Sequence, residues 1–322
     1  MTGPTAAGPD TRADAAGTTG APHGSAGTTD HPGTVNGLPE PATKPAAPGE
    51  VATLVLSGKE LAAAIRADVA ARVAEGPAPR LAIVTATSDE ASAWYVRSLA
   101  RAAAKVGIAC EVVDLGPDAD AQALRATLTD TDADGVILQT PLPAGVSGRD
   151  LALAIDPARD VDGANPVSLG RLASGLPSYA PATAEAVVAL LDHHGVALAG
   201  REVVVVGRST VVGKPLAHLL LDRDATVTVC HSRTADLAAV TRRAQILVVA
   251  VGRAGLITAE HVAPGAVVID VGTHPTADGG LVGDVDAGSV TGRAGALSPV
   301  PGGVGPVTTA LLLRHTLDTA RG

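Results

Sequence analysis

Aromatic residues are nearly absent from this 322-residue sequence, which contains no Phe, one Trp and two Tyr. Hydrophobic residues still make up 46% of the chain, so it can bury a sizeable core. That core must be built from Val, Leu, Ile and Ala. A pocket that stacks a flat ligand has few rings to use, and Tyr95 stands out for that reason.

Cysteine, positive charge and long apolar runs are also scarce. Cys110 and Cys230 are too few for a disulfide scaffold and form no CxxC pair, so we expect both to be buried and reduced. The net charge of −9 argues against a nucleic-acid or acidic-membrane surface. No apolar run approaches the ~18 residues of a membrane span, and the N-terminus lacks the pattern of a secretory signal. These absences favour a protein of a reducing cytoplasm, without nucleic-acid, membrane or metal partners.

The order of predicted elements indicates the fold class. Residues 1–52 are rich in Ala, Gly, Thr and Pro and lack apolar periodicity, so we expect a disordered tail there. Apolar spacing predicts helices over residues 58–75, 91–106, 120–129, 184–194, 212–221, 235–243 and 307–319. Strands are expected over residues 80–85, 108–115, 135–139, 202–206, 225–230, 246–250 and 266–271. This alternation indicates an α/β fold with parallel sheets, and the length favours two domains of roughly 100–200 residues each.

A glycine turn follows the apolar strand at 202–206. The chain reads Gly207-Arg208-Ser209, and Gly213 follows at the start of the next predicted helix. Gly207 lets the chain turn off the strand, and Gly213 allows close packing or close approach to a pyrophosphate at the helix N-terminus. The spacing is GxSxxxG rather than GxGxxG, so the prediction depends on the strand before it and the helix after it. We predict a Rossmann-type unit that binds a dinucleotide.

The end of the second strand of this unit indicates which dinucleotide. NAD-binding units usually place an acid there, but the chain reads His231-Ser232-Arg233-Thr234 after Cys230. Ser232 and Arg233 suit a 2′-phosphate, which Arg208 could also reach, so we predict NADP. The alternative is that Ser232 and Arg233 only cap a helix that begins at Thr234.

Two further strand ends belong to the same unit. Gly252 ends a later strand, where we expect a contact with the nicotinamide ribose. Asp270 ends another strand, and we expect it to fix loops rather than to act in catalysis.

Together these motifs resemble the methylenetetrahydrofolate dehydrogenase/cyclohydrolase family over about residues 54 to 320. The segments that carry the resemblance are Ser92-Ala93-Trp94-Tyr95-Val96, Gln139-Thr140-Pro141-Leu142-Pro143, Asp160-Val161-Asp162-Gly163, the glycine turn with Val212-Gly213-Lys214-Pro215, the run 231–234, and Pro299-Val300-Pro301-Gly302-Gly303-Val304-Gly305-Pro306. The last of these segments and the run 160–163 are the most specific.

The resemblance implies a two-domain fold with a folate cleft between the domains. The N-terminal α/β substrate domain would cover residues 53–178, completed by a last helix over 306–320, and the Rossmann-type NADP domain would cover 179–305. Family members form homodimers and transfer a hydride from the methylene bridge of 5,10-methylenetetrahydrofolate to NADP, which gives the methenyl cation. In bifunctional members, water then opens that cation to 10-formyltetrahydrofolate.

The resemblance also implies roles for residues in the cleft. Tyr95 would stack on the folate, Asp162 would hydrogen-bond the pterin, and Gln139 would lie near the one-carbon bridge. Gly303, Gly305 and Pro306 would belong to a loop that lines the pocket. A carboxylate suits the donors of a pterin, and an aromatic face suits a developing cation. The alternatives are that Asp162 is a turn residue and Tyr95 a core aromatic.

The sequence departs from the family at the residue tied to the hydrolytic step. The family carries a Lys four residues after the Tyr, one helical turn on and facing the same cleft, and this chain has Leu99. A leucine can carry no proton, so we predict that cyclohydrolase activity is lost or weak. Hydride transfer depends chiefly on orientation and can survive.

Other departures lie mostly on the substrate side, at Thr87, Ser168 and the run 181–184. They leave open a specialised paralogue that acts on another one-carbon adduct, or a non-catalytic relative that binds NADP or folate. A fully bifunctional enzyme is the remaining alternative.

Overall fold

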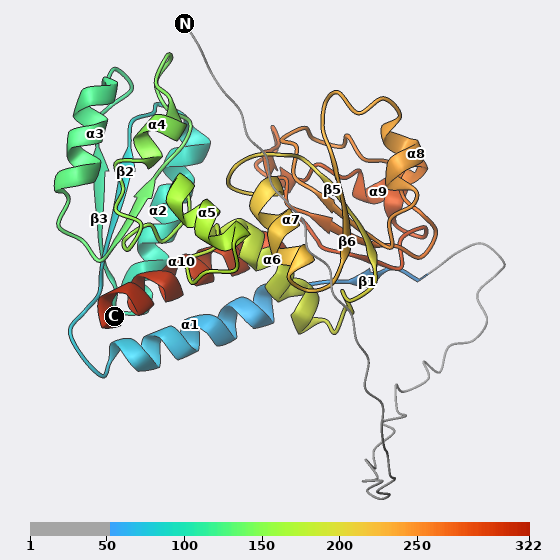
Figure 1. Cartoon of the computed structure of the whole chain (residues 1–322), viewed down its shortest axis with the longest axis horizontal. Coiled ribbons are helices and arrows are strands. Elements are labelled where there is room, and N and C mark those ends of the chain that lie inside the picture. The colour runs from blue at the N-terminus through green and yellow to red at the C-terminus, as the bar shows by residue number, and fades with distance from the viewer. Residues whose placement is uncertain (1–51) are drawn as a thin grey trace, which may run out of the picture. The chain divides into compact units, whose positions relative to one another are not determined.

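The computed structural model of the chain describes residues 52–322, which belong to one compact unit. The tail expected over residues 1–52 therefore lies outside the described residues, except for its last position. Two parallel sheets and the helices around them make up the described part (Figure 1). The predicted α/β fold class is confirmed.

The larger sheet has six strands in the order β1-β11-β8-β7-β5-β6, all paired in parallel. Its strands are β1 (Leu54–Val55), β5 (Glu202–Val206), β6 (Thr226–Cys230), β7 (Ile246–Val249), β8 (Val267–Asp270) and β11 (Ala296–Leu297). The central strands β5 and β7 are almost entirely buried, as expected for a parallel sheet covered on both faces. The strand β5 lies between β6 and β7, and Gly207 directly follows its last residue, so the turn at Gly207 lies at the carboxyl edge of the sheet.

The smaller sheet has three parallel strands in the order β3-β2-β4. They are β2 (Arg80–Thr85), β3 (Ala109–Asp114) and β4 (Gly135–Leu138). The middle strand β2 pairs with both neighbours, so that Ile83 lies beside Val112 on one side and Ile137 on the other. A hairpin of β9 (His274–Pro275) and β10 (Leu281–Val282) stands apart from both sheets.

Helices cover the faces of both sheets and run between them (Figure 1). They are α1 (Lys59–Val73), α2 (Glu90–Lys105), α3 (Ala121–Asp130), α4 (Gly148–Ala152), α5 (Pro166–Ala173), α6 (Ala182–His193), α7 (Gly213–Leu221), α8 (Leu237–Thr241), the short 3₁₀ helix η1 (Ala259–His261), α9 (Ala287–Val290) and α10 (Val304–Arg321). The last helix, α10, packs against α1 and α6 and also contacts β2 and β4. One aliphatic core therefore joins residues of both sheets through α10.

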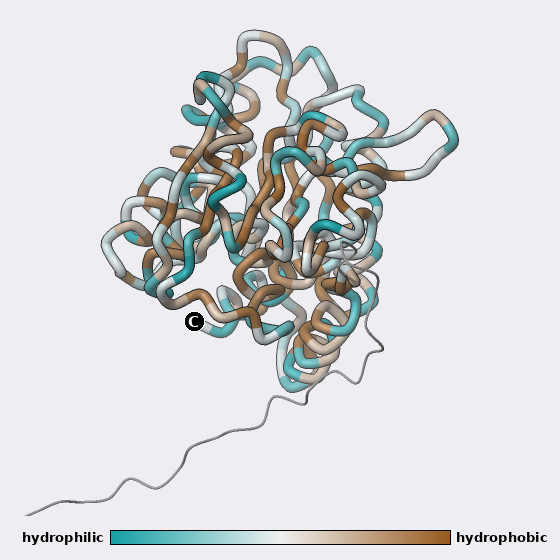
Figure 2. The backbone as a smooth tube through the Cα atoms, turned by 90° about the vertical axis from the view of Figure 1, so that its right-hand side faces the viewer, coloured by the Kyte–Doolittle hydropathy of each residue, from teal (hydrophilic) through white to brown (hydrophobic). Residues whose placement is uncertain are grey.

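The core is aliphatic, as the composition predicts. The largest fully buried side chains are all Leu or Ile, and Figure 2 shows hydrophobic residues concentrated on the inner strands and helices. Cys230 is buried and Cys110 is half-buried, and both are free thiols in different sheets. Burial raises the pKa of the Cys110 thiol to about 11, which keeps it protonated and unreactive.

Several elements differ from the expectation. The predicted N-terminal domain begins at residue 53, but β1 pairs with β11 and so belongs to the larger sheet. The helix expected over 235–243 is limited to α8, because Asp236 caps its N-terminus by accepting from the N–H of Ala239. The last helix begins at Val304 rather than 307, since a Pro in the first turn, here Pro306, breaks no hydrogen bond of the helix. Gly305 and Pro306 are therefore helical rather than part of a loop.

Candidate functional site

The turn after β5 requires both of its glycines. Gly207 has a φ of 128°, and a Cβ on it would overlap the carbonyl oxygen of Ala250 at the end of β7. A Cβ on Gly213 would overlap the carbonyl oxygen of Gly207 and lie 2.6 Å from its carbonyl carbon. The first turn of α7 thus packs directly on the end of β5. This close packing of helix on strand is one of the roles that glycines have in a dinucleotide-binding turn.

Ser209 organises the start of α7. Its hydroxyl oxygen accepts from the N–H of Val212 at 3.1 Å and, at 3.5 Å, from that of Gly213. Arg208 and Ser209 are both exposed beside this helix N-terminus. The partial positive charge of a helix N-terminus and a nearby guanidinium favour an anion at the same place.

The turn after β6 is stabilised by hydrogen bonds within it, and the side chains of Ser232 and Arg233 stay exposed. The N–H of His231 donates to the hydroxyl of Thr234 at 2.9 Å, and the N–H of Arg233 donates to Nδ1 of His231 at 3.1 Å. Ser232 and Arg233 are exposed. Because α8 begins at Leu237 with Asp236 as its cap, the alternative in which Ser232 and Arg233 cap a helix at Thr234 is wrong.

The turn after β7 depends on an acid that sequence reasoning missed. Asp284 is fully buried, and its carboxylate accepts from the N–H groups of Val251, Gly252 and Arg253. It also meets Nε2 of His274 at 2.8 Å. The position of Gly252 is therefore set by a residue more than thirty positions away, which no local pattern indicates.

Asp270, at the end of β8, plays a similar part. Its carboxylate accepts from the N–H groups of Gly272, Asp284 and Val285 at 2.9 to 3.0 Å. Burial raises its pKa to about 6, although these backbone hydrogen bonds oppose the shift. Asp270 also lines a cavity that is described below, but its hydrogen bonds fix loops, as the sequence leads us to expect.

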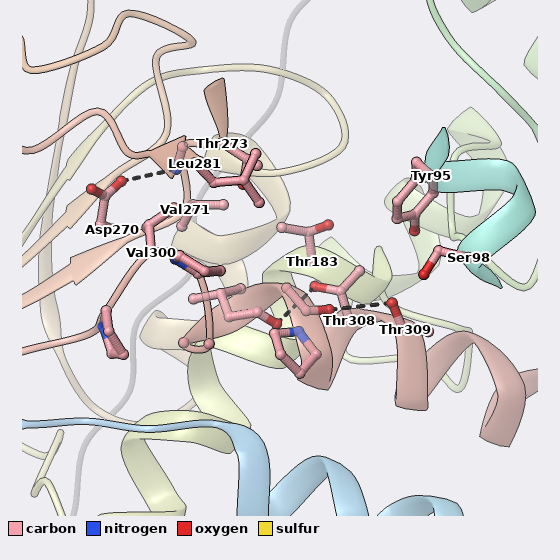
Figure 3. A pocket seen from close by; sticks show the side chains of 18 of the residues that line it. Tyr95, Ser98, Thr183, Asp270, Val271, Thr273, Leu281, Val300, Thr308 and Thr309 are labelled. Carbon is pink, nitrogen blue, oxygen red and sulfur yellow. Dashed lines mark hydrogen bonds between the residues drawn. The ribbon is translucent and has the colours of Figure 1, made fainter. Parts of the chain in front are cut away.

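A cavity of about 500 Å³ brings four of the predicted folate-side residues together. Figure 3 shows Tyr95 and Ser98 on α2, Thr308 and Thr309 on α10, and Asp270 across from them. The remaining lining residues are Trp94, Thr183, Val271, Gly272, Thr273, Leu281 and the run 299–306. Tyr95, Gly303, Gly305 and Pro306 therefore share one cavity, which lies between the carboxyl edge of the larger sheet and α2.

Gln139 lies in a neighbouring cavity of about 960 Å³ that shares Trp94 and Tyr95 with the first. Its side-chain amide donates to the carbonyl oxygen of Thr140 at 2.6 Å. The hydroxyl of Ser92, at the start of α2, donates to the same oxygen at 3.1 Å. Ser92 thus ties the helix that carries Tyr95 to the turn that carries Gln139.

The carboxylate of Asp162 affects the pKa of the Tyr95 hydroxyl. Burial raises the pKa of the Tyr95 hydroxyl, the carboxylate of Asp162 raises it further, and a hydrogen bond with Thr309 opposes the shift. Burial also raises the pKa of Asp162 to about 7, and the charge of Asp160 adds to the shift. Asp162 is absent from the lining of the two cavities described here, but it lies close enough to Tyr95 to act on it.

The turn that carries Asp162 is organised by its neighbours. The buried carboxylate of Asp160 accepts from the N–H groups of Ala164 and Asn165 and from the hydroxyl of Ser168, at 2.8 to 2.9 Å. Gly163 has a φ of 60°, and a Cβ on it would lie 2.5 Å from the nitrogen of Pro181. Asp160 and Gly163 therefore form the turn, which leaves the carboxylate of Asp162 outside its hydrogen bonds.

Leu99 does not face the cleft as expected. It is 1% exposed and packs in the aliphatic core with Val96 and Ala103. The residues of α2 that join Tyr95 in the cavity are Trp94 and Ser98, and the sequence did not single out Ser98. Between residues 52 and 322, no lysine lines this cavity.

No helix in the part from residue 52 onward is long and apolar enough to cross a membrane. Within the same part of the chain, no group of three or more His, Cys, Asp or Glu side chains is placed to hold a metal ion.

Comparison with known families decides the relationship. Residues 56–162 match the tetrahydrofolate dehydrogenase/cyclohydrolase catalytic domain, and residues 181–322 match the NAD(P)-binding domain of the same family. The chain belongs to the tetrahydrofolate dehydrogenase/cyclohydrolase family. The resemblance predicted from the motifs is confirmed, as is the two-domain fold with a Rossmann-type NAD(P)-binding sheet.

Relatives and solved structures agree over most of the chain. A protein of Saccharopolyspora erythraea named "Bifunctional protein FolD 1" is 67% identical over 84% of this chain and 94% of its own length. A protein of the same name from Rhodococcus jostii is 63% identical over 83% and 93%. The structure of the bifunctional enzyme FolD from Campylobacter jejuni is 36% identical and covers 84% of this chain and 99% of its own, with a TM-score of 0.79. That of the FolD enzyme of Trypanosoma brucei, complexed with NADP cofactor and inhibitor, is 37% identical with the same TM-score and covers 84% and 97%.

Proposed function

We propose that this family member oxidises 5,10-methylenetetrahydrofolate to the methenyl form with NADP as hydride acceptor. The observation that carries the proposal is the cavity in which Tyr95 faces Gly303, Gly305 and Pro306 at the carboxyl edge of the dinucleotide-binding sheet. Ligands of open parallel sheets bind at this edge.

The residues present fit NADP. Gly207 and Gly213 let the end of β5 and the start of α7 pack backbone against backbone, where a side chain on either would clash, and this packing presents the N-terminus of α7 to a pyrophosphate. Exposed Ser232 and Arg233 follow β6, where a 2′-phosphate would lie, and Arg208 and His231 flank the same place. Gly252, held by Asp284, would support the nicotinamide ribose. When bound, the cofactor supplies the acceptor for the hydride.

The folate-side residues would bind and orient the substrate. Tyr95 presents the aromatic face for the ring system and the developing cation. Asp162, when ionised, would accept from the pterin N–H groups, and Gln139 would lie by the one-carbon bridge. The start of α10, with Gly303, would line the opposite wall. Orientation of the methylene carbon is the main contribution that these residues make to hydride transfer.

We also propose that the hydrolytic step is lost or weak. Leu99 occupies the position of the family's Lys, is buried in the core, and can neither bind nor move a proton. The bifunctional names of the relatives favour the opposite outcome, in which other groups of the cleft open the methenyl ring. A homodimer formed through the dinucleotide domain also remains a proposal that rests on the resemblance.

Absorbance in the near ultraviolet tests the redox proposal, because the methenyl product absorbs there. Methylenetetrahydrofolate is mixed with the full chain and either NADP or NAD. We expect methenyl formation with NADP and much slower formation with NAD. Absence of product with both cofactors would refute the dehydrogenase proposal. The remaining alternatives would then be a non-catalytic binding protein or an enzyme that acts on another one-carbon adduct.

A further inference from the structure

His315 is a buried titratable residue that the proposed chemistry does not use. It lies on α10, is 4% exposed, and points away from the solvent into the packing between α10 and α6. Its Nδ1 meets the carbonyl oxygen of Val161 at 2.7 Å. Its Nε2 meets the carboxylate of Glu185, on α6, at 2.9 Å.

Both ring nitrogens of His315 therefore face acceptors. A carbonyl oxygen accepts only, and an ionised carboxylate does the same, so both contacts form as hydrogen bonds only when both nitrogens carry a proton. The ring is then an imidazolium with a positive charge, paired with Glu185. The second oxygen of Glu185 accepts from Arg314, so this carboxylate lies between two cations.

The surroundings of Glu185 agree with that pairing. Burial acts to raise the pKa of Glu185, but the hydrogen bond and charge of His315, together with Arg314, outweigh it, and the net shift is downward. An ionised Glu185 is the partner that an imidazolium requires.

The ring of His315 is also held from its side. Tyr179 packs against it with ring centroids 4.9 Å apart, and the Tyr179 hydroxyl accepts from Thr319 at 2.8 Å. The backbone of residues 179–181 in turn packs against Gly163, next to Asp162. The turn at 160–163 is thus fixed by His315 on one side and by the 179–181 segment on another.

We propose that His315 is a positioning residue for Asp162, and that it sets through the Val161 peptide where the pterin-binding carboxylate stands in the cleft. This inference rests on the proposed function, because it assigns Asp162 to the pterin of the substrate. The hydrogen bond to the carbonyl of Val161 lies one residue before Asp162, so movement of that peptide moves the carboxylate directly.

Charge supports the same role. Burial has the largest effect on the pKa of Asp162 and raises it, and the charge of Asp160 raises it further. The charge of His315 and a hydrogen bond from the N–H of Ala182 lower the pKa of Asp162. His315 therefore favours the ionised carboxylate that a pterin's N–H groups need. The charged groups that face His315 itself are Glu185, Arg314, Asp160 and Asp162. Loss of the imidazolium should raise the pKa of Asp162 still further.

The test compares KM for methylenetetrahydrofolate and for NADP in His315→Leu, His315→Asn and Glu185→Gln. We expect His315→Leu to raise the folate KM about ten-fold, the effect of one lost charged hydrogen bond, with the NADP KM unchanged. His315→Asn keeps a donor for Val161 and should lose less. His193→Asn, a change of an exposed His on α6, is the matched control and should match the wild type.

The outcomes separate the two proposals. If the wild type makes no methenyl product, the proposed function fails. If the wild type is active and His315→Leu leaves the folate KM unchanged, or raises both KM values alike, the positioning role is overturned. If His315→Leu does not fold, the KM values of Glu185→Gln and His315→Asn for methylenetetrahydrofolate and NADP are compared with those of the wild type instead. ¹⁵N NMR at neutral pH, assigned by the signals lost in His315→Asn, should show two protonated ring nitrogens, and a single one contradicts the imidazolium.

Discussion

Tyr95 and Leu99 lie one helical turn apart on α2, but only Tyr95 reaches the cleft. Tyr95 lines both cavities described here, whereas Leu99 is 1% exposed and packs in the core. Side chains four residues apart lie on the same side of a helix, but core side chains surround Leu99. A longer side chain at position 99 would therefore have to extend past those neighbours to reach the cavity. The position that the resemblance assigns to the family's Lys therefore holds a residue that contributes to packing.

Replacing Leu99 by Lys should have two opposite effects. The ammonium enters apolar surroundings, so the free energy of unfolding should fall by about 2 kcal/mol or more. If the missing Lys is all that the hydrolytic step lacks, the variant should open methenyltetrahydrofolate faster than the wild type. Chemical denaturation and the decay of methenyl absorbance measure the two effects. Leu99→Met, which keeps volume and apolarity, should change stability by less than about 1.5 kcal/mol and add no hydrolysis.

Arg233→Ala should weaken binding of NADP but not of NAD. A charged hydrogen bond to the 2′-phosphate contributes about 1.5–3 kcal/mol, so KM for NADP should rise roughly ten-fold or more. Arg243→Ala is the control, since Arg243 is another exposed arginine, near the opposite edge of the same sheet, and forms an ion pair with Glu202. An unchanged preference for NADP in Arg233→Ala would refute the assignment of the phosphate site.

Gly213→Ala should impair both stability and cofactor binding. The added Cβ would overlap the backbone of Gly207, which no side-chain movement can relieve, and overpacking of this kind costs about 1–3 kcal/mol. Gly170→Ala, on α5 with no atom near the added Cβ, should be neutral or slightly stabilising. Thermal unfolding and NADP titration measure both variants. Equal behaviour of the two would show that the turn is looser than described.

Asp162 should make folate binding depend on pH. Burial raises its pKa from 3.8 to about 7, so the carboxylate is ionised fully only above neutral pH, and KM for folate should fall as pH rises through 7. The folded chain holds a proton between pH 3.8 and 7 that the unfolded chain has lost, so this group's contribution to stability decreases as pH rises through that window. Asp162→Asn should remove both dependences. A pH profile that persists in Asp162→Asn would assign the dependence to another group.

The sequence predicts those parts of the site that depend on local patterns. The strand before Gly207, the helix after Gly213 and the absence of an acid after β6 are all readable from neighbouring residues. Asp284 and His315 are not, because each acts on backbone groups far away in the sequence. The pairing of β1 with β11 is equally non-local, and two-residue strands leave no periodic pattern. The inward direction of Leu99 depends on how α2 packs, which its spacing from Tyr95 alone does not determine.

The time course of methenyl absorbance at several concentrations of the full chain tests both parts of the proposed function. These are that the protein catalyses hydride transfer and that it does not catalyse hydrolysis of the methenyl product. Methylenetetrahydrofolate and NADP are supplied, and both the rise and the later decay are followed. We predict that methenyl absorbance rises at a rate proportional to protein concentration and then decays at the rate seen without protein. A decay that also quickens with protein concentration would contradict the loss of hydrolysis, and no rise at all would contradict the redox assignment.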